Sequence, residues 1–371
     1  MSVDQEAQKH RYVVKKMLAK PQHEGARATV RRNIGRYELR NLDPFLFLDE
    51  SSASPPAGFH DHPHRDFETV SYMIQGAVTH QDFSGNNGTI KAGDLQWMTA
   101  GRGIIHSEMP AGEGVHRGLQ LWINLSFKDK MMEPRYQELQ SKDIREDEKD
   151  SVHVRIIAGE AFGVRSPIYT QTPTLFLDFT MKPVAQLEQH IPDTWTAFAY
   201  ILEGETVFGI PPKCSSSAIT SHHAVVLSVG DVVAVRNASS KMLRFVLIGG
   251  QPLNEPVVHY GPFMMNTEEE IKKTIEDYHM FRNGFENAKN WKSNKARVGE
   301  EEESGGAGNS VAACKRGPEK EIRAKAVERE EHEESVVSEV LQISEEGQGG
   351  GELGGRASCV CNNQGRCEMM W

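Results

Sequence analysis

The sequence predicts an all-β protein made of two similar β-barrels in tandem, followed by a short helix. Three observations lead to this prediction. Short segments alternate apolar and other residues, glycine-containing turns separate them, and one pair of motifs recurs in the second half of the body. Alternation with a period of two is typical of half-buried strands, and many short strands with glycine turns indicate a sandwich or barrel.

The strands are clearest in two segments. GLQLWINLS at 118–126 and PTLFLDFTM at 173–181 each place an apolar residue at every second position. The turn SGNNG at 84–88 separates short strands in the same way that glycine-containing turns do in barrels. We therefore expect strands at 118–126 and 173–181 and on both sides of this turn, with one face of each strand buried.

An internal repeat predicts the tandem arrangement. SYMIQG at 71–76 is followed by IKAGDLQWM at 90–98, and AYILEG at 199–204 is followed by LSVGDVVAV at 227–235. Each half ends one strand with an aromatic residue, apolar residues and glycine, and opens another after Gly-Asp. A repeat of this size indicates two related structural units.

One helix is expected near the end of the body. Thr267 and Glu270 have the spacing of a capping box. The expected apolar stripe consists of Ile271, Ile275, Tyr278 and Phe281, and Gly284 is expected to end or interrupt the helix. Beyond this helix, from residue 293 to residue 371, the chain is acidic, rich in glycine and poor in aromatic residues. Such a composition predicts a disordered tail.

Two pairs of metal-binding side chains stand out in the first half. His62 and His64 lie two residues apart in GFHDHPHRDFETV, and His106 and Glu108 do so in GRGIIHSEMP. Residues i and i+2 of a strand point to the same face, so two neighbouring strands would gather all four around one ion. Three imidazoles and a carboxylate suit iron, manganese, copper or nickel. Glu68 is an alternative fourth ligand.

The second half has no such pairs. Its nearest candidates are His190, His222 and His223, and none of them shows the paired spacing. We therefore expect the second barrel to lack metal ligands. Trp97, Trp122 and Trp195 are interpreted as core residues.

Composition limits the function classes. The chain has 371 residues and a formal net charge of −10, which argues against direct binding to nucleic acid. We expect no secretory signal and no membrane span, because the first residues are polar and mixed in charge. The five cysteines form no disulfide framework, so we expect an intracellular protein.

Several long motifs resemble the pirin family, whose members are bicupins of the cupin superfamily. These motifs are GFHDHPHRDFETVSYMIQG, GDLQWMTAGRGIIHSEMP, GLQLWINL, EPRYQEL and GPFMMNTEEEI. The resemblance runs from about Tyr12 to Lys292. It implies two cupin domains, which we place at 12–145 and 146–292, with the tail at 293–371. It also implies one mononuclear iron in the first domain, bound by His62, His64, His106 and Glu108.

The resemblance implies two functions. One is flavonol (quercetin) 2,3-dioxygenase activity on a flavonol-like molecule and dioxygen, in which Glu108 is placed to take the proton of the substrate hydroxyl. The other is iron-dependent, redox-sensing co-regulation of transcription with a transcription-factor partner. The expected location is the nucleus and the cytoplasm. Two residues depart from the family's usual pattern, His60 in place of proline and Asp66 in place of glycine, and both are expected near the mouth of the site.

Overall fold

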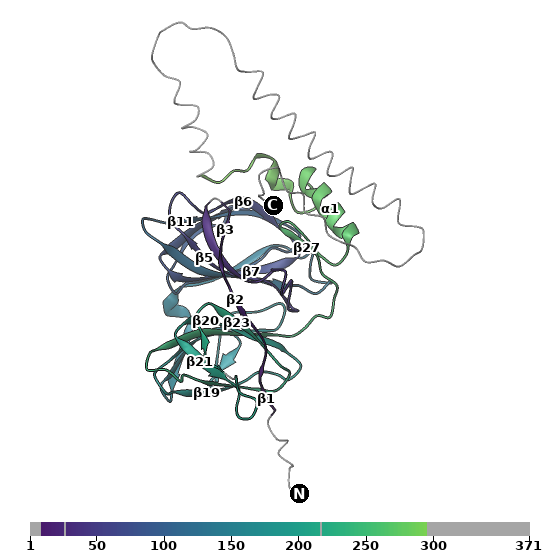
Figure 1. Cartoon of the computed structure of the whole chain (residues 1–371). Coiled ribbons are helices and arrows are strands. Elements are labelled where there is room, and N and C mark those ends of the chain that lie inside the picture. The colour runs from purple at the N-terminus through teal and green to yellow at the C-terminus, as the bar shows by residue number, and fades with distance from the viewer. Residues whose placement is uncertain (1–8, 26, 216, 295–371) are drawn as a thin grey trace, which may run out of the picture. The chain divides into compact units, whose positions relative to one another are not determined.

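Strands make up most of the chain that is described here, as the all-β prediction requires (Figure 1). The computed structural model describes residues 9–25, 27–215 and 217–294. The predicted disordered tail therefore lies outside the described residues, apart from Ser293 and Asn294. None of the helices in the described part is long and apolar enough to cross a membrane.

The first barrel consists of two sheets. The larger has seven strands in the order β13-β10-β7-β12-β5-β4-β3. These are β3 (Pro21–Glu24), β4 (Ala28–Ile34), β5 (Phe45–Ala53), β7 (Phe67–Gln75), β10 (Leu95–Thr99), β12 (His116–Asn124) and β13 (Arg135–Leu139). The smaller sheet has the order β6-β11-β8-β9, with β6 (Phe59–His64), β8 (Ala77–Asp82), β9 (Asn87–Lys91) and β11 (Ile104–Pro110).

The second barrel repeats this plan. Its larger sheet has the order β14-β15-β18-β25-β20-β23-β2, with β2 (Val13–Leu18), β14 (Arg145–Lys149), β15 (Val152–Ala158), β18 (Thr174–Met181), β20 (Thr196–Glu203), β23 (His223–Leu227) and β25 (Leu243–Gly250). Its smaller sheet contains β1 (His10–Arg11), β19 (Gln186–His190), β21 (Glu205–Phe208), β22 (Ile219–Thr220) and β24 (Val232–Arg236). Outside the sheets lie the pairs β16 (Glu160–Ala161) with β17 (Val164–Arg165) and β26 (Val258–Tyr260) with β27 (Phe263–Met265), and the short 3-10 helices η1 (Ser141–Asp143) and η2 (Glu286–Asn290).

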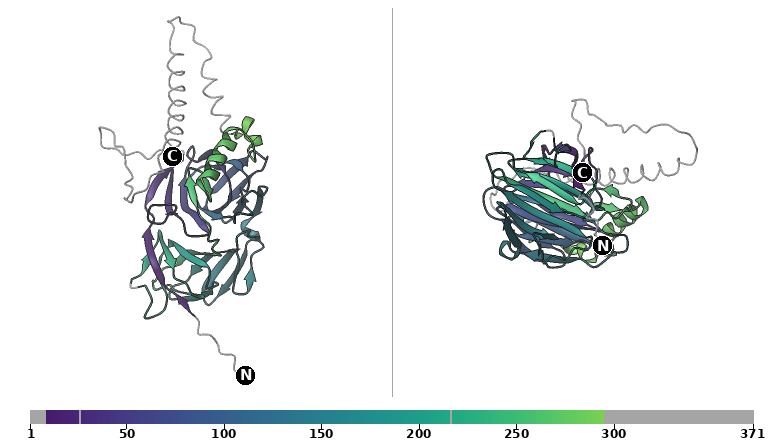
Figure 2. Two further views of the ribbon diagram at one scale, coloured as in Figure 1. Left: turned by 90° about the vertical axis from the view of Figure 1, so that its right-hand side faces the viewer. Right: turned by 90° about the horizontal axis from the view of Figure 1, so that it is seen from below.

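The two larger sheets pack face to face, and the main hydrophobic core lies between them (Figure 2). Leu121 and Phe45 of the first barrel meet Phe176 and Phe198 of the second in this core. The rings of Phe45 and Phe198 lie 5.2 Å apart, edge to face. The alternating apolar residues of β12 therefore point toward the second barrel and away from the interior of the first barrel.

Two tyrosines at equivalent positions of the predicted repeat join the barrels. Tyr72 donates a hydrogen bond to Asp178 of the second barrel at 2.7 Å. Tyr200 does the reverse and donates to Glu50 of the first barrel at 2.5 Å. Both side chains are buried, and burial raises the pKa of both hydroxyls. Each carboxylate also pairs with an arginine of its own barrel, Arg244 or Arg117.

The chain exchanges its ends between the barrels. Strand β2 pairs with β23 at the edge of the second barrel's larger sheet. Residues 258–291 pack instead on the first barrel, through a cluster that contains Ile105. The division into domains at 12–145 and 146–292 stays a prediction. Any domain boundary has to take account of this exchange of chain ends between the barrels.

The predicted helix is α1 (Glu268–His279). The capping box is confirmed, because Thr267 accepts from the backbone of Glu270 and the Glu270 side chain accepts from the backbone of Thr267. The predicted apolar stripe was wrong at Phe281. The helix ends before this residue, whose φ of 52° lies in the left-handed region and whose side chain is exposed.

Candidate metal centre

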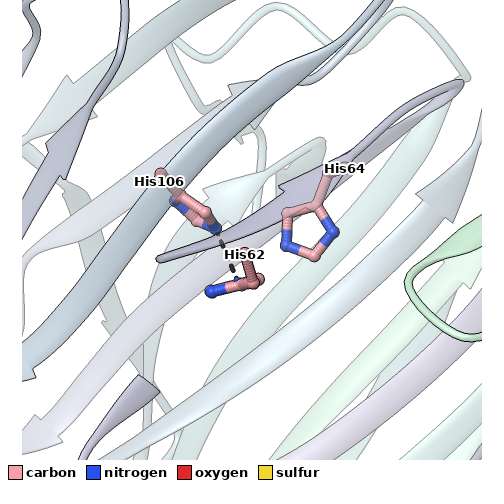
Figure 3. A group of neighbouring side chains, drawn as sticks. All are labelled: His62, His64 and His106. Carbon is pink, nitrogen blue, oxygen red and sulfur yellow. Dashed lines mark hydrogen bonds between the residues drawn. The ribbon is translucent and has the colours of Figure 1, made fainter. Parts of the chain in front are cut away.

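Three of the predicted ligands come together inside the first barrel. His62 and His64 lie on β6, and His106 lies opposite His62 on the neighbouring strand β11. One ring nitrogen from each of the three lies within 4.8 Å of the others. Figure 3 shows the rings of the two strands turned toward one another. Alternation within each strand and antiparallel pairing between them bring these side chains to the same face.

Hydrogen bonds orient the His62 ring. Its Nδ1 lies 2.6 Å from the backbone carbonyl of His60. Because a carbonyl only accepts, Nδ1 carries the proton, and Nε2 of a neutral ring has a free lone pair. This Nε2 lies 3.0 Å from Nε2 of His106 (Figure 3). Such a backbone contact on the outer nitrogen is the usual way in which a metal-binding histidine is held.

Burial keeps the other two rings neutral. His64 and His106 are 3% and 2% exposed. Burial lowers the pKa of both rings well below the ordinary value, and the nearby His62 lowers it further. A metal binds the neutral imidazole, so neither ring has to lose a proton when an ion arrives near neutral pH.

Glu108 reaches across the barrel to the larger sheet. Its carboxylate accepts from the Ser71 hydroxyl at 2.8 Å and from the Gln120 amide at 3.0 and 3.3 Å. Ser71 on β7 and Gln120 on β12 are direct neighbours across those two strands. The structure therefore brings the three histidines together, whereas Glu108 is outside this cluster and is held by two donors of the larger sheet. Its role as fourth ligand stays a prediction.

The alternative ligand Glu68 points elsewhere. Its carboxylate accepts from Thr99 on β10 at 2.8 Å, and the side chain is fully buried. The spacing from His64 misleads because the strand does not continue. Asp66 has a φ of 77°, which separates β6 from β7 and changes the alternation of faces. A position that needs this φ also explains why glycine is usual there.

Neither His60 nor Asp66, the two residues that depart from the family's usual pattern, belongs to the histidine cluster. His60 is exposed, and only its backbone carbonyl contacts a predicted ligand. Asp66 is buried near Lys130, and burial raises the pKa of its carboxyl to about 7. Both were expected near the mouth of the site because they share strand parity with the ligands. This parity argument does not hold for Asp66, because its positive φ ends the alternation of faces along β6.

The buried Glu68 predicts a pH dependence of stability. Burial raises its pKa from 4.5 to about 7, although the hydrogen bond from Thr99 acts in the opposite direction. Between these two pH values the folded state keeps a proton that the unfolded state releases, so this group makes stability fall as pH rises from 4.5 through 7. The difference corresponds to at most about 3 kcal/mol.

Glu68→Gln should therefore flatten the decline in the free energy of unfolding between pH 5 and pH 8. Urea unfolding of metal-free protein at several pH values measures it. Glu269→Gln, on the exposed first turn of α1, is the control and should leave the slope as in the wild type. An unchanged slope in Glu68→Gln would show that the carboxyl is ionised throughout this range.

The comparison with known protein families decides the family. The Pirin family matches residues 27–123, and the Pirin C-terminal cupin domain matches residues 176–284. The chain belongs to the pirin family. A pirin-like protein from Solanum lycopersicum is 61% identical over 293 residues, which cover 79% of this chain and 100% of that protein. Human pirin is 53% identical over 278 residues, covering 75% of this chain and 95% of human pirin.

A comparison with solved structures finds a related fold. The quercetin 2,3-dioxygenase of Acinetobacter baumannii is 32% identical, with a TM-score of 0.67, over 73% of this chain and 98% of that one. The two-barrel pirin fold and the cupin-type sheets expected from the sequence are thus confirmed.

The interiors of the two barrels of this pirin differ in chemistry. The second barrel is filled by apolar side chains, among them Leu177, Phe179 and Phe245. In the first barrel, the corresponding inward positions of β7 and β12 carry Ser71 and Gln120, which bind Glu108. A barrel packed with apolar side chains leaves no polar room for an ion, whereas the first barrel offers imidazoles and a carboxylate.

Several residues of the site were not expected from the sequence. Ser71 and Gln120 are among them, although Gln120 is a polar residue inside the strongly apolar segment GLQLWINL, which is a usable signal. Trp122 is another neighbour, with its ring 5.0 Å from that of His64. It stacks on Phe47 and Phe67 at 4.5 and 4.7 Å, so it belongs to the wall of the barrel, in line with its interpretation as a packing residue.

Proposed function

We propose that this pirin-family protein binds one iron ion in its first barrel and acts as a flavonol (quercetin) 2,3-dioxygenase. The observation that carries the proposal is the convergence of three imidazoles from β6 and β11 inside the first barrel, two of them buried. The 32% identity with a structure described as a quercetin 2,3-dioxygenase, over nearly the whole length of that enzyme, supports it.

The donor set fits the proposed ion. His62, His64 and His106 would hold it, and Glu108, two residues after His106 on β11, is the proposed fourth ligand. Imidazole and carboxylate together suit iron and its neighbours among the transition metals. When bound, the iron would supply Lewis acidity toward the hydroxyl of a flavonol and redox chemistry with dioxygen.

Glu108 is placed to act as the base. Its carboxylate oxygens accept hydrogen bonds from Ser71 and Gln120. The 3-hydroxyl of a flavonol loses a proton before the ring is cleaved, and Glu108 would take it. The two donors also fix the direction of the carboxylate, which favours transfer to one oxygen at a defined place.

Entry to the site is from the side of His62, which is half-buried while the other two histidines are buried. Gln120 and Trp122 are half-buried as well, although both point to the inside of the barrel. A planar aromatic molecule would approach the metal from this side.

Glu108→Gln should lower kcat for quercetin by about 100-fold to 10,000-fold, because an amide cannot accept the proton. Its metal content should fall less, since three imidazoles remain. Oxygen uptake with quercetin and elemental analysis of the same sample measure the two effects. A variant with wild-type kcat would show that Glu108 is not the base.

The test of the function itself is oxygen uptake by the iron-loaded wild type with quercetin and other flavonols. If no flavonol is turned over, the alternative applies, in which iron changes redox state and a transcription-factor partner responds. The partner and a location in both nucleus and cytoplasm belong to that alternative proposal. Binding of the candidate factor to the iron(II) and iron(III) forms would then be compared.

A further inference from the structure

The C-terminal segment, residues 258–294, covers the back of the strands that carry the histidines. Phe263, Met265, Ile271 and Phe285 of this segment pack with Ile105, which lies on β11 directly before His106. Figure 1 shows α1 and β27 beside the barrel that contains β6 and β11. Ile105 and His106 point to opposite faces of the strand, so the segment supports the histidine from behind.

A buried arginine ties the segment to the end of β6. Arg65 follows His64 and is 1% exposed. Its guanidinium forms an ion pair with Asp277 of α1 at 3.2 Å and donates to the Asn283 carbonyl at 2.6 Å. It also lies over the Phe285 ring, 4.6 Å from its centre. All these partners belong to the C-terminal segment.

Close backbone packing ties the same segment to the start of β11. Gly103 comes just before this strand, and a Cβ built on it would lie 3.0 Å from the Phe285 ring. A Cβ on Gly284 would lie 2.2 Å from the carbonyl oxygen of Arg102. Both glycines have positive φ, at 143° and 115°. The two chain segments therefore approach more closely than side chains at these positions would allow.

The segment also reaches the ligand strand through polar contacts. The backbone of Ser293 donates to Asp61, next to His62, at 3.0 Å. Each of the two ligands on β6 thus has a neighbour in the chain, Asp61 or Arg65, that contacts the C-terminal segment.

We propose that the C-terminal segment is a positioning element of the metal centre. It fixes the end of β6 through Arg65 and the start of β11 through Gly103 and Ile105, and thereby sets how tightly the three histidines hold an ion. This inference rests on the proposed function, because it assumes that an ion binds there. Partners behind metal ligands usually change affinity by about 10-fold to 100-fold when they are lost.

Asp277→Asn in the full-length protein tests the proposal. It keeps the shape of the side chain but removes the ion pair with Arg65. We expect nickel(II) affinity, measured by competition with a chelator, to fall about tenfold or more, and the EPR spectrum of the iron(III) form to change. The matched control is Glu276→Gln, the preceding residue of α1, which is exposed and pairs with Arg282. It should leave both readouts unchanged.

All affinities are measured at a temperature at which the metal-free variants are fully folded by circular dichroism. If Asp277→Asn does not fold, Phe285→Leu replaces it, because leucine keeps the site apolar but loses the ring under Arg65. A lowered melting temperature with unchanged nickel affinity and an unchanged EPR spectrum would overturn the proposal and leave the proposed function intact. A wild type that binds neither metal would overturn both.

Discussion

Replacing His62 and His106 together by alanine should abolish metal binding and any activity that depends on it. Each change removes one of the three nitrogen atoms that lie within 4.8 Å of one another, and a single imidazole remains. The loss of affinity should exceed the roughly 100-fold that accompanies the loss of a supporting residue. Elemental analysis of the purified variant and chelator competition with nickel(II) measure it.

Histidines of the second barrel provide the control. His190 lies at the exposed end of β19, and His223 contacts Thr220, three residues before it in the chain. Their joint replacement by alanine should leave metal content as in the wild type. His222 is left unchanged, because it contacts Glu50 at 3.1 Å, where the barrels meet. Full metal content in the His62 and His106 double variant would show that the ion binds elsewhere.

The three histidines were predictable because their arrangement follows from local rules. Within a strand, residues two apart share a face, and two such pairs close together in a β-rich chain point to one cluster. The same rule failed at Glu68, because Asp66 adopts a positive φ and interrupts the strand between the two residues. A single backbone angle of this kind leaves little trace in the pattern of apolar residues.

The supports of the cluster were not predictable for a different reason. Arg65 binds Thr274, Asp277 and Asn283, which lie 209 to 218 positions away along the chain. Periodicity describes neighbours on the same element and contains no information on such distant pairs. The stripe of α1 shows the same limit. Its buried face includes Thr274 and Asp277, which face Arg65, and not only the apolar residues.

Arg65→Met should lower the free energy of unfolding of the metal-free protein by about 3–5 kcal/mol. The Arg65 and Asp277 side chains are only 2% and 1% exposed, and removing the buried member of this ion pair leaves the buried carboxylate with the half-exposed Arg282 as its remaining charged partner. Methionine keeps much of the volume, so the cost of a cavity is small. Urea unfolding at pH 7 measures the change.

A matched control comes from a second arginine on the same carboxylate. Arg282 also pairs with Asp277, at 2.9 Å, but its side chain is 49% exposed. Arg282→Met should therefore cost much less than Arg65→Met, as for other exposed ion pairs. Adding Asp277→Leu to Arg65→Met should regain part of the lost stability, because the buried carboxylate that lost Arg65 is then removed as well. If Arg65→Met and Arg282→Met cost the same small amount, water reaches the Arg65 pair, and the C-terminal segment is held on the first barrel by its apolar contacts alone.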